Sequence, residues 1–382
     1  MKIAIDASSV NNSGGLTYLY ELLVNYEFKK TDNLEIEVWA SKNTLDRLPN
    51  LKFYKKKDKS KFNKNIFTRF LWQTFLYNKM LRNSKTDVLY SLSAFYLGSF
   101  KPFILIHQNS LPFTNSELIN YKYSLKYFKL LLQKKLTLYS FSRSTLVIFL
   151  NDYVRKIIIE LLQKKITTKI IKHGLSKNFL RNPDKNNLLA KKYNNLDKIR
   201  LLYVSNFHTY KNHIALLKAF NILKKKYTLE LTFVGKQFDQ SLSNVKKFIK
   251  KNQLSNIYIF NEINYEDIKK IYNDTDFCIY PSTCENFPFG VIESLGLSIP
   301  IIVSKYICNL DSTFQKIISF DPNNIDEIVD SIEKYILNNH LRKKNTIELN
   351  YLVKKLDPVV NSKITFDTII LSYKNYINRI NE

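Results

Sequence analysis

Two glutamates separated by seven residues, Glu285 and Glu293, form the most distinctive polar pair in the sequence. They belong to the run 280–293, YPSTCENFPFGVIE, whose residue types predict a strand end, a turn and a helix start in that order. Ligands of doubly wound sheets bind beyond the carboxyl ends of the strands, where a helix N-terminus favours phosphate. A diphosphate fits this corner, and each carboxylate can accept hydrogen bonds from hydroxyl groups at a different end of one ligand.

The elements that must position such a site alternate along the chain. An apolar run at 3–7 is followed by a polar loop at 8–15, which contains Gly14 and Gly15, and then by a helical pattern at 17–26. Further short apolar runs occupy 34–40, 87–91, 103–107 and 145–150, most of them with helical or loop stretches between them. This alternation predicts an α/β lobe with a parallel sheet.

The same alternation starts again after a mostly polar stretch at 182–198, which we interpret as a linker. Apolar runs then follow at 200–205, 230–235, 257–260, 277–281 and 300–304, with helical patterns between them. At 382 residues the chain is long enough for two domains. We therefore predict Rossmann-like lobes at 1–185 and 196–356, and a C-terminal helix at 357–382 that packs back on the first lobe.

The run 280–293 resembles the Glu-(seven residues)-Glu signature of retaining glycosyltransferases with the GT-B fold, most closely glycosyltransferase family 4. Other segments resemble that family in the order it uses, and they reach from Met1 to about residue 324: 2–20, 69–73, 86–91, 106–109, 204–212, 233–235 and 300–303. The resemblance implies two Rossmann-like lobes that face each other across a cleft. The first would bind the acceptor and the second the nucleotide sugar.

The resemblance also implies a role for each matching position. Glu293 would hold the ribose hydroxyls of the nucleotide, and Glu285 would contact the transferred sugar. Lys211 would bind the diphosphate, and His107 would contact the donor sugar or the acceptor. No metal or cofactor is implied, because a lysine and helix N-terminal amides can stabilise the leaving diphosphate. The other implied donor-binding residues are Gly14, Gly15, Ser205, Asn206, Asn286, Phe287 and Phe289.

Two positions depart from the family pattern. Asn206 stands near the place of an arginine that commonly precedes the matching lysine, so Lys211 would provide the cationic contact largely alone. Pro288 replaces a glycine and has no N–H to donate to a phosphate. Both departures concern the diphosphate, whereas Glu285 and Glu293 are kept.

Each candidate also fits an ordinary structural interpretation. His107 could be a core histidine, Glu293 a solvated or capping carboxylate, and Lys211 a surface lysine. Glu285 could be an ordinary loop charge, and a glycine pair by itself marks only a turn. Their order along two successive α/β patterns is what favours a shared site.

The charge balance favours a polyanionic neighbour. The chain has 59 Lys and Arg against 33 Asp and Glu, a formal net charge of +26. Basic and bulky apolar residues concentrate in 51–82 and 119–143, which predicts a surface that rests on an anionic membrane and receives a membrane-proximal acceptor. The same spacing also fits helices in which Trp72, Phe75 and Leu76 face the protein core.

The cysteine pattern and the apolar runs indicate the compartment. The three cysteines show no CxxC-type pairing, the N-terminus has no signal-peptide pattern, and no run approaches the ~20 apolar residues of a membrane-spanning helix. We therefore expect a cytoplasmic protein, peripheral on the inner face of the plasma membrane if it meets a membrane.

These observations predict a retaining glycosyltransferase that moves a sugar from a nucleotide-diphosphate sugar to a saccharide or lipid-linked acceptor. A role in bacterial surface polysaccharide synthesis (O-antigen, capsule or lipopolysaccharide) fits such an enzyme. A nucleotide-sugar epimerase of the same architecture is the nearest alternative, although the spacing of the two glutamates argues against it. A basic nucleic-acid-binding protein is a further alternative, but the sequence shows no recognition helix, zinc module or RNA-binding aromatic motif. We therefore expect no nucleic-acid partner.

Overall fold

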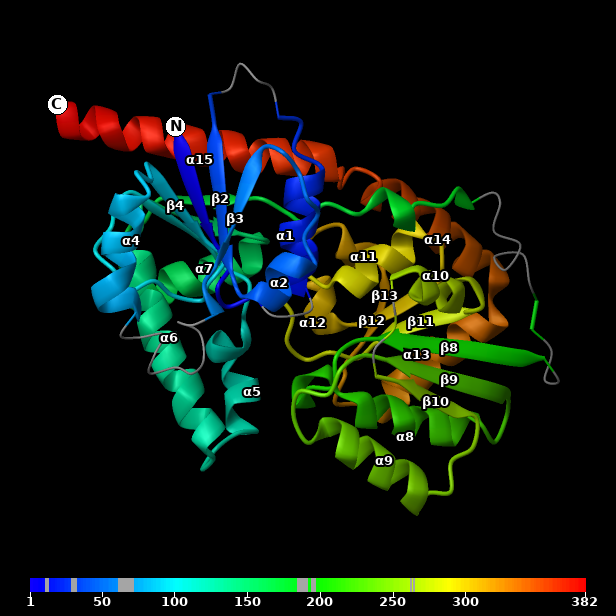
Figure 1. The fold of residues 1–382 in the computed structure, drawn as a ribbon. Coiled ribbons are helices and arrows are strands. Elements are labelled where there is room, and N and C mark those ends of the chain that lie inside the picture. The colour runs from blue at the N-terminus through cyan, green and yellow to red at the C-terminus, as the bar shows by residue number, and fades with distance from the viewer. Residues whose placement is uncertain are drawn as a thin grey trace. The chain divides into compact units, whose positions relative to one another are not determined.

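The computed structural model describes residues 1–10, 14–28, 33–60, 72–183, 192–193, 197–261, 263 and 265–382. It contains two compact units, Met1–Gly174 with Asp357–Glu382, and Leu175–Leu356 (Figure 1). The division falls between Gly174 and Leu175, before the stretch 182–198 that the sequence analysis takes as the linker. Residues 184–191 and 194–196 of that stretch lie outside the described residues.

The first unit is built on a parallel sheet in the order β3-β2-β1-β4-β5-β6-β7. Its central strands are continuous apolar runs with buried side chains, as expected where helices cover both faces of a parallel sheet. The strand order changes direction between β1 and β4, which makes their carboxyl ends the switch point of this sheet. The strands are β1 (Lys2–Asp6), β2 (Glu35–Ala40), β3 (Tyr54–Asp58), β4 (Val88–Ser91), β5 (Phe103–Ile106), β6 (Leu146–Phe149) and β7 (Thr168–Ile170).

The C-terminal helix α15 (Pro358–Asn381) belongs to this first unit, where it packs against α1 and β4 (Figure 1). The Ser362 hydroxyl donates to the Leu22 carbonyl at 2.6 Å, and Tyr373 donates to Asp87 at 3.3 Å. The other helices of the unit are α1 (Gly14–Val24), α2 (Lys42–Asp46), η3 (Trp72–Leu76), α4 (Tyr77–Asn83), η4 (Leu111–Phe113), α5 (Asn115–Ile119), α6 (Leu125–Arg143) and α7 (Asp152–Leu162).

The second unit repeats the architecture with the strand order β10-β9-β8-β11-β12-β13, so its switch point lies between β8 and β11. Its strands are β8 (Lys198–Val204), β9 (Thr228–Val234), β10 (Ile257–Phe260), β11 (Phe277–Tyr280), β12 (Ile301–Ser304) and β13 (Ile318–Phe320). Its helices are η5 (Lys177–Phe179), η8 (Thr209–Lys211), α8 (His213–Leu223), α9 (Ser241–Lys251), α10 (Tyr265–Asn273), α11 (Phe289–Gly296), α12 (Lys305–Cys308), η9 (Phe314–Lys316), α13 (Ile325–Leu337) and α14 (Asn339–Val353). Among the helices of the described ranges, none is long and apolar enough to cross a membrane.

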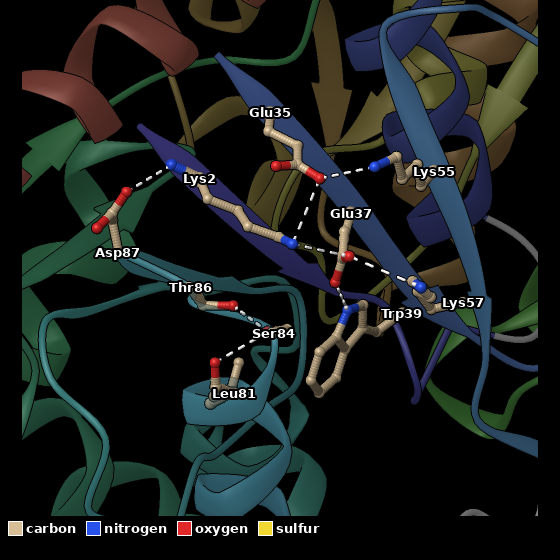
Figure 2. Close-up of polar contacts among 10 residues, drawn as sticks. All are labelled: Lys2, Glu35, Glu37, Trp39, Lys55, Lys57, Leu81, Ser84, Thr86 and Asp87. Carbon is tan, nitrogen blue, oxygen red and sulfur yellow. Dashed lines mark hydrogen bonds and ion pairs between the residues drawn. The ribbon is translucent and has the colours of Figure 1, made fainter. Parts of the chain in front are cut away.

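The basic segment 51–82 divides into parts with different surroundings. Residues 55–57 lie in the edge strand β3, where Lys55 pairs with Glu35 at 2.9 Å and Lys57 lies 3.8 Å from Glu37 (Figure 2). Residues 61–71 lie outside the described residues. Trp72 is buried, with its ring centroid 4.4 Å from that of Tyr77, so the core-facing interpretation is correct for this residue. Phe75 and Leu76, which that interpretation also places in the core, are exposed instead.

A partly buried charge cluster links β1 to β2 in the first unit (Figure 2). The Lys2 ammonium lies 3.0 Å from Glu37 and 3.4 Å from Glu35. Glu37 is buried and also accepts a hydrogen bond from the Trp39 indole at 3.0 Å, whereas the Glu35 side chain is 46% exposed. The two carboxylates therefore share one lysine but differ in burial.

We expect Glu37→Leu to lower the free energy of unfolding by about 3 kcal/mol, because it leaves Lys2 and the Trp39 N–H without their buried acceptor. Glu35→Leu is the matched control and should cost less than about 1 kcal/mol, because exposed ion pairs contribute little. Urea unfolding of both variants measures the difference. Equal losses would contradict the assignment of the stabilising contact to Glu37.

Candidate functional site

A lysine and a glutamate meet at the switch point of the second sheet. Lys211 ends η8, in the loop after β8, and Glu285 lies in the loop between β11 and α11. β8 and β11 are adjacent parallel strands, so both loops leave the same edge of the sheet. The Lys211 ammonium is in direct contact with the Glu285 carboxylate, and both side chains are largely buried. The structure thus joins two residues that are 74 positions apart in the sequence.

Hydrogen bonds fix the backbone beneath this ion pair. The Thr283 amide and hydroxyl both donate to the Tyr210 carbonyl, at 2.8 and 3.0 Å. The Tyr203 hydroxyl, on β8, donates to the Lys211 carbonyl at 2.8 Å and lies 3.0 Å from the Ser282 hydroxyl. Burial, and then the charge of Glu285, raise the pKa of Tyr203, so this hydroxyl stays protonated as a donor. The two loops are therefore tied together before any ligand binds.

Glu293 lies on α11, the helix that follows the Glu285 loop. Its carboxylate accepts a hydrogen bond from the Tyr272 hydroxyl at 3.1 Å. Tyr272 is fully buried on α10, and burial raises its pKa well above the usual value, so it acts as a donor. Sequence reasoning missed Tyr203 and Tyr272; the signal that could have found them is a tyrosine within an otherwise apolar element.

The start of α11 has the features of an anion site. The helix begins at Phe289 with Pro288 as its N-cap, and its first turn holds no carboxylate. The backbone of Pro288 accepts hydrogen bonds from the amides of Val291 and Ile292, at 3.1 and 3.4 Å. Phe287 is buried, and its ring centroid lies 6.4 Å from that of Phe289 in an edge-to-face contact. The positive end of the helix dipole at this point favours a negatively charged ligand.

Ser205 and Asn206 follow β8 and hold the end of β9. The Asn206 side chain accepts a hydrogen bond from the Lys236 amide at 3.0 Å, and the Ser205 amide donates to the Val234 carbonyl at 2.8 Å. A side chain at Gly235 would clash with the Ser205 carbonyl, so only glycine allows this approach. Asn206, which stands near the place of the arginine common in the family that the sequence resembles, therefore supports the loop backbone.

Asn286 is the remaining implied donor-binding residue of the second unit. It follows Glu285 in the sequence and is buried. Three sequence-predicted residues, Gly14, Gly15 and His107, lie instead in the first unit. Gly14 and Gly15 begin α1, and a Cβ on Gly15 would lie 3.5 Å from the Gln108 side chain, an ordinary contact. The first turn of α1 thus lies next to the loop that follows β5.

His107 directly follows β5 and is buried among three phenylalanine rings, those of Phe113, Phe141 and Phe149. Burial lowers the pKa of its imidazole to about 3, and a hydrogen bond to the backbone of Asn109 only partly opposes this shift. The imidazole is therefore neutral near pH 7. In that state it can act as a hydrogen-bonding group toward a sugar hydroxyl but carries no charge.

A buried carboxylate at the switch point of the first sheet is a candidate that sequence reasoning missed. Asp6, at the end of β1, is fully buried and accepts hydrogen bonds from the Ser91 hydroxyl at 3.0 Å and the Ser93 hydroxyl at 3.3 Å. The Ser8 amide donates to its other oxygen at 3.0 Å. The available signal was an aspartate at the end of an apolar strand. In the described part of the chain, no group of three or more His, Cys, Asp or Glu could hold a metal ion.

Part of the chain is similar to a known protein family. Residues 184–348 match the family described as "Glycosyl transferases group 1". The chain is 28% identical to protein CapJ of Staphylococcus aureus over 197 residues, which are 50% of this chain and 49% of CapJ. It is 24% identical to the capsular polysaccharide biosynthesis glycosyltransferase CapM of the same organism over 259 residues, 66% of each protein. The matches thus cover about half to two thirds of these relatives.

Several solved structures have a similar fold over nearly the whole length of this chain. Sucrose-phosphate synthase from Thermosynechococcus elongatus has a TM-score of 0.78 at 13% identity, covering 99% of this chain and 100% of that one. HepE from Anabaena in complex with UDP and glucose has a TM-score of 0.70 at 15% identity, covering 96% and 99%. At such identities the similarity establishes the fold alone. The chain has the predicted GT-B fold of two Rossmann-like units, and the family match falls within its second unit.

Proposed function

We propose that this protein transfers a sugar, with retention of anomeric configuration, from a nucleotide-diphosphate sugar to a hydroxyl of a saccharide or lipid-linked saccharide. The observation that carries the proposal is the contact between Lys211 and Glu285 at the β8–β11 switch point, with Glu293 on the helix that follows. The family match of this unit supports it, as does the UDP and glucose bound to HepE, which has the same fold. The name of CapM supports a place in surface polysaccharide synthesis.

The chemistry follows from the charges of these side chains. As the bond between the anomeric carbon and the diphosphate breaks, its electron pair stays on the diphosphate, which gains negative charge. Lys211 and the N-terminus of α11 stabilise that charge without a metal ion. Glu285 leaves its contact with Lys211 and accepts hydrogen bonds from hydroxyls of the transferred sugar, while Glu293 accepts those of the ribose. The acceptor oxygen bonds to the anomeric carbon, and its proton passes to an oxygen of the departing diphosphate.

A thermal-shift screen with UDP-, GDP-, ADP-, dTDP- and CMP-sugars tests the proposal. We expect one nucleoside diphosphate sugar to raise the melting temperature, because a ligand bound by the native state alone stabilises it. CMP-sugars carry a single phosphate and are the matched control, so they should give a smaller shift than a diphosphate donor. No shift with any donor would contradict the proposal.

The selected donor is then incubated with and without acceptor saccharides, in the presence of EDTA. We expect nucleoside diphosphate release that depends on an acceptor, and NMR of the product should show the anomeric configuration of the donor. An epimerised donor formed without acceptor would instead support the epimerase alternative. An inverted product would contradict retention, and loss of activity in EDTA would contradict the metal-independent mechanism.

A further inference from the structure

Helix α6 of the first unit has apolar side chains on two opposite faces. One face is buried in the unit and includes Leu130, Thr137 and Phe141. The other bears large side chains at successive spacings of three, four and seven residues, which places them in one stripe along the helix. This exposed stripe comprises Leu125, Phe128, Leu132 and Tyr139, whose exposed fractions are 80%, 63%, 51% and 53%.

The residues beside the exposed stripe are basic. The segment 119–143 contains six Lys or Arg and a formal charge of +6, because it includes no Asp or Glu. At about 100° per residue, Lys129 and Lys135 fall on opposite flanks of the stripe. Tyr123, in the turn before the helix, is 90% exposed and extends the apolar surface. Long lysine side chains can keep their charged ends at the phosphate level while an apolar stripe enters the acyl region.

Helix α9 shows that a lysine-rich helix of this protein does not always expose large apolar side chains as well. It carries Lys246, Lys247, Lys250 and Lys251, yet none of its large apolar side chains is exposed. A second copy of the chain does not fit the α6 face well, because a symmetric contact would bring the flanking lysines of both copies together. A negatively charged bilayer complements both the stripe and its flanks.

We propose that the exposed stripe of α6 docks the first unit on an anionic lipid bilayer. Phe128 and Leu132 enter the outer acyl region, while Lys129 and Lys135 contact lipid phosphates. The proposal is independent of the proposed transferase activity, since it needs only the first unit's surface. It assigns the predicted membrane contact of 119–143 to one face of α6. In the other predicted segment, Lys55 and Lys57 of β3 pair with Glu35 and Glu37 of β2, and Trp72 is buried.

Co-sedimentation with vesicles tests the proposal, using phosphatidylcholine alone and phosphatidylcholine mixed with phosphatidylglycerol. We expect the wild type to pellet with the anionic vesicles at low salt and to dissociate as the salt concentration rises. Phe128→Ser combined with Leu132→Ser should weaken binding by roughly tenfold or more, because the lost apolar contacts are those inserted into lipid. Lys129→Gln combined with Lys135→Gln should weaken binding and flatten its salt dependence.

Two control variants match these changes elsewhere in the chain. Leu337→Ser with Tyr351→Ser removes side chains that are 72% and 71% exposed in the second unit, and Lys246→Gln with Lys247→Gln removes the same charge from α9. Both should bind vesicles as the wild type does. Failure of the wild type to pellet, or equal losses in test and control variants, would overturn the proposal. Size-exclusion chromatography that shows a dimer lost in the Phe128 and Leu132 variant, with no vesicle binding, would assign the stripe to self-association instead.

Discussion

Replacing Lys211 with alanine is expected to lower kcat/KM for sugar transfer by about 10²- to 10³-fold, the usual cost of removing one preorganised donor from a charged transition state. The expected loss is large because Lys211 would provide the cationic contact to the diphosphate largely alone. Asn206, near the place of the arginine common in the resembled family, accepts a hydrogen bond from the Lys236 amide. Steady-state kinetics with the donor found in the screen measures the effect. Lys218→Ala, on the exposed side of α8, is the matched control and should leave the rate unchanged.

Glu285→Gln separates the two members of the ion pair. The substitution removes the charge that holds Lys211 in the ligand-free protein, so we expect free nucleoside diphosphate to bind as tightly as before or more tightly. The rate of sugar transfer should fall nevertheless, because an amide oxygen accepts hydrogen bonds from sugar hydroxyls less strongly than a carboxylate does. Calorimetry with the nucleoside diphosphate and the transfer assay report the two effects separately. A parallel loss of nucleotide affinity and rate would show that Glu285 supports the fold of the loop rather than the sugar.

Replacing Glu293 with alanine is expected to weaken nucleotide binding by at least about 100-fold, because hydrogen bonds to a charged acceptor contribute about 1.5–3 kcal/mol each and a ribose offers two hydroxyls. Calorimetric titration of the nucleoside diphosphate measures this loss. Tyr272→Phe should give a smaller loss, since Glu293 keeps its charge but loses the donor that orients it at 3.1 Å.

A dideoxy nucleotide without the 2′ and 3′ hydroxyls provides the control for this assignment. It should bind the wild type as weakly as the natural nucleotide binds Glu293→Ala. It should also lose no further affinity when Glu293 is replaced, because the two changes remove the same interaction. Independent, additive losses would mean that Glu293 acts elsewhere than at the ribose.

The local sequence predicted the apolar, central elements well. β1, β4, β5 and β11 are short apolar runs that occur where they were expected, because buried parallel strands need such runs. The edge strands β3, β7 and β13 were not predicted, since strands such as YKKKD or TKI face solvent and carry no apolar pattern. Their strand conformation comes from pairing with a neighbour that is distant in sequence.

Similar sequence patterns also had different outcomes in the folded protein. The stretches 66–82 and 119–143 both combine basic and bulky apolar residues, yet Trp72 is buried and Phe128 is exposed. Periodicity shows which residues share a helix face but not what that face meets. His107 likewise could be a core or a site residue; the structure places it among phenylalanine rings at a strand end, and its role remains a prediction.

By itself, the sequence determined the α/β alternation, the two-domain architecture and the spacing of Glu285 and Glu293, because these depend on local periodicity and on residues that are close in the chain. Only the tertiary structure decided that Lys211 contacts Glu285, that Tyr203 ties their loops and that Tyr272 donates to Glu293. These contacts join side chains from different strands and helices. They form because adjacent parallel strands deliver their loops to one edge of the sheet, which no local pattern specifies.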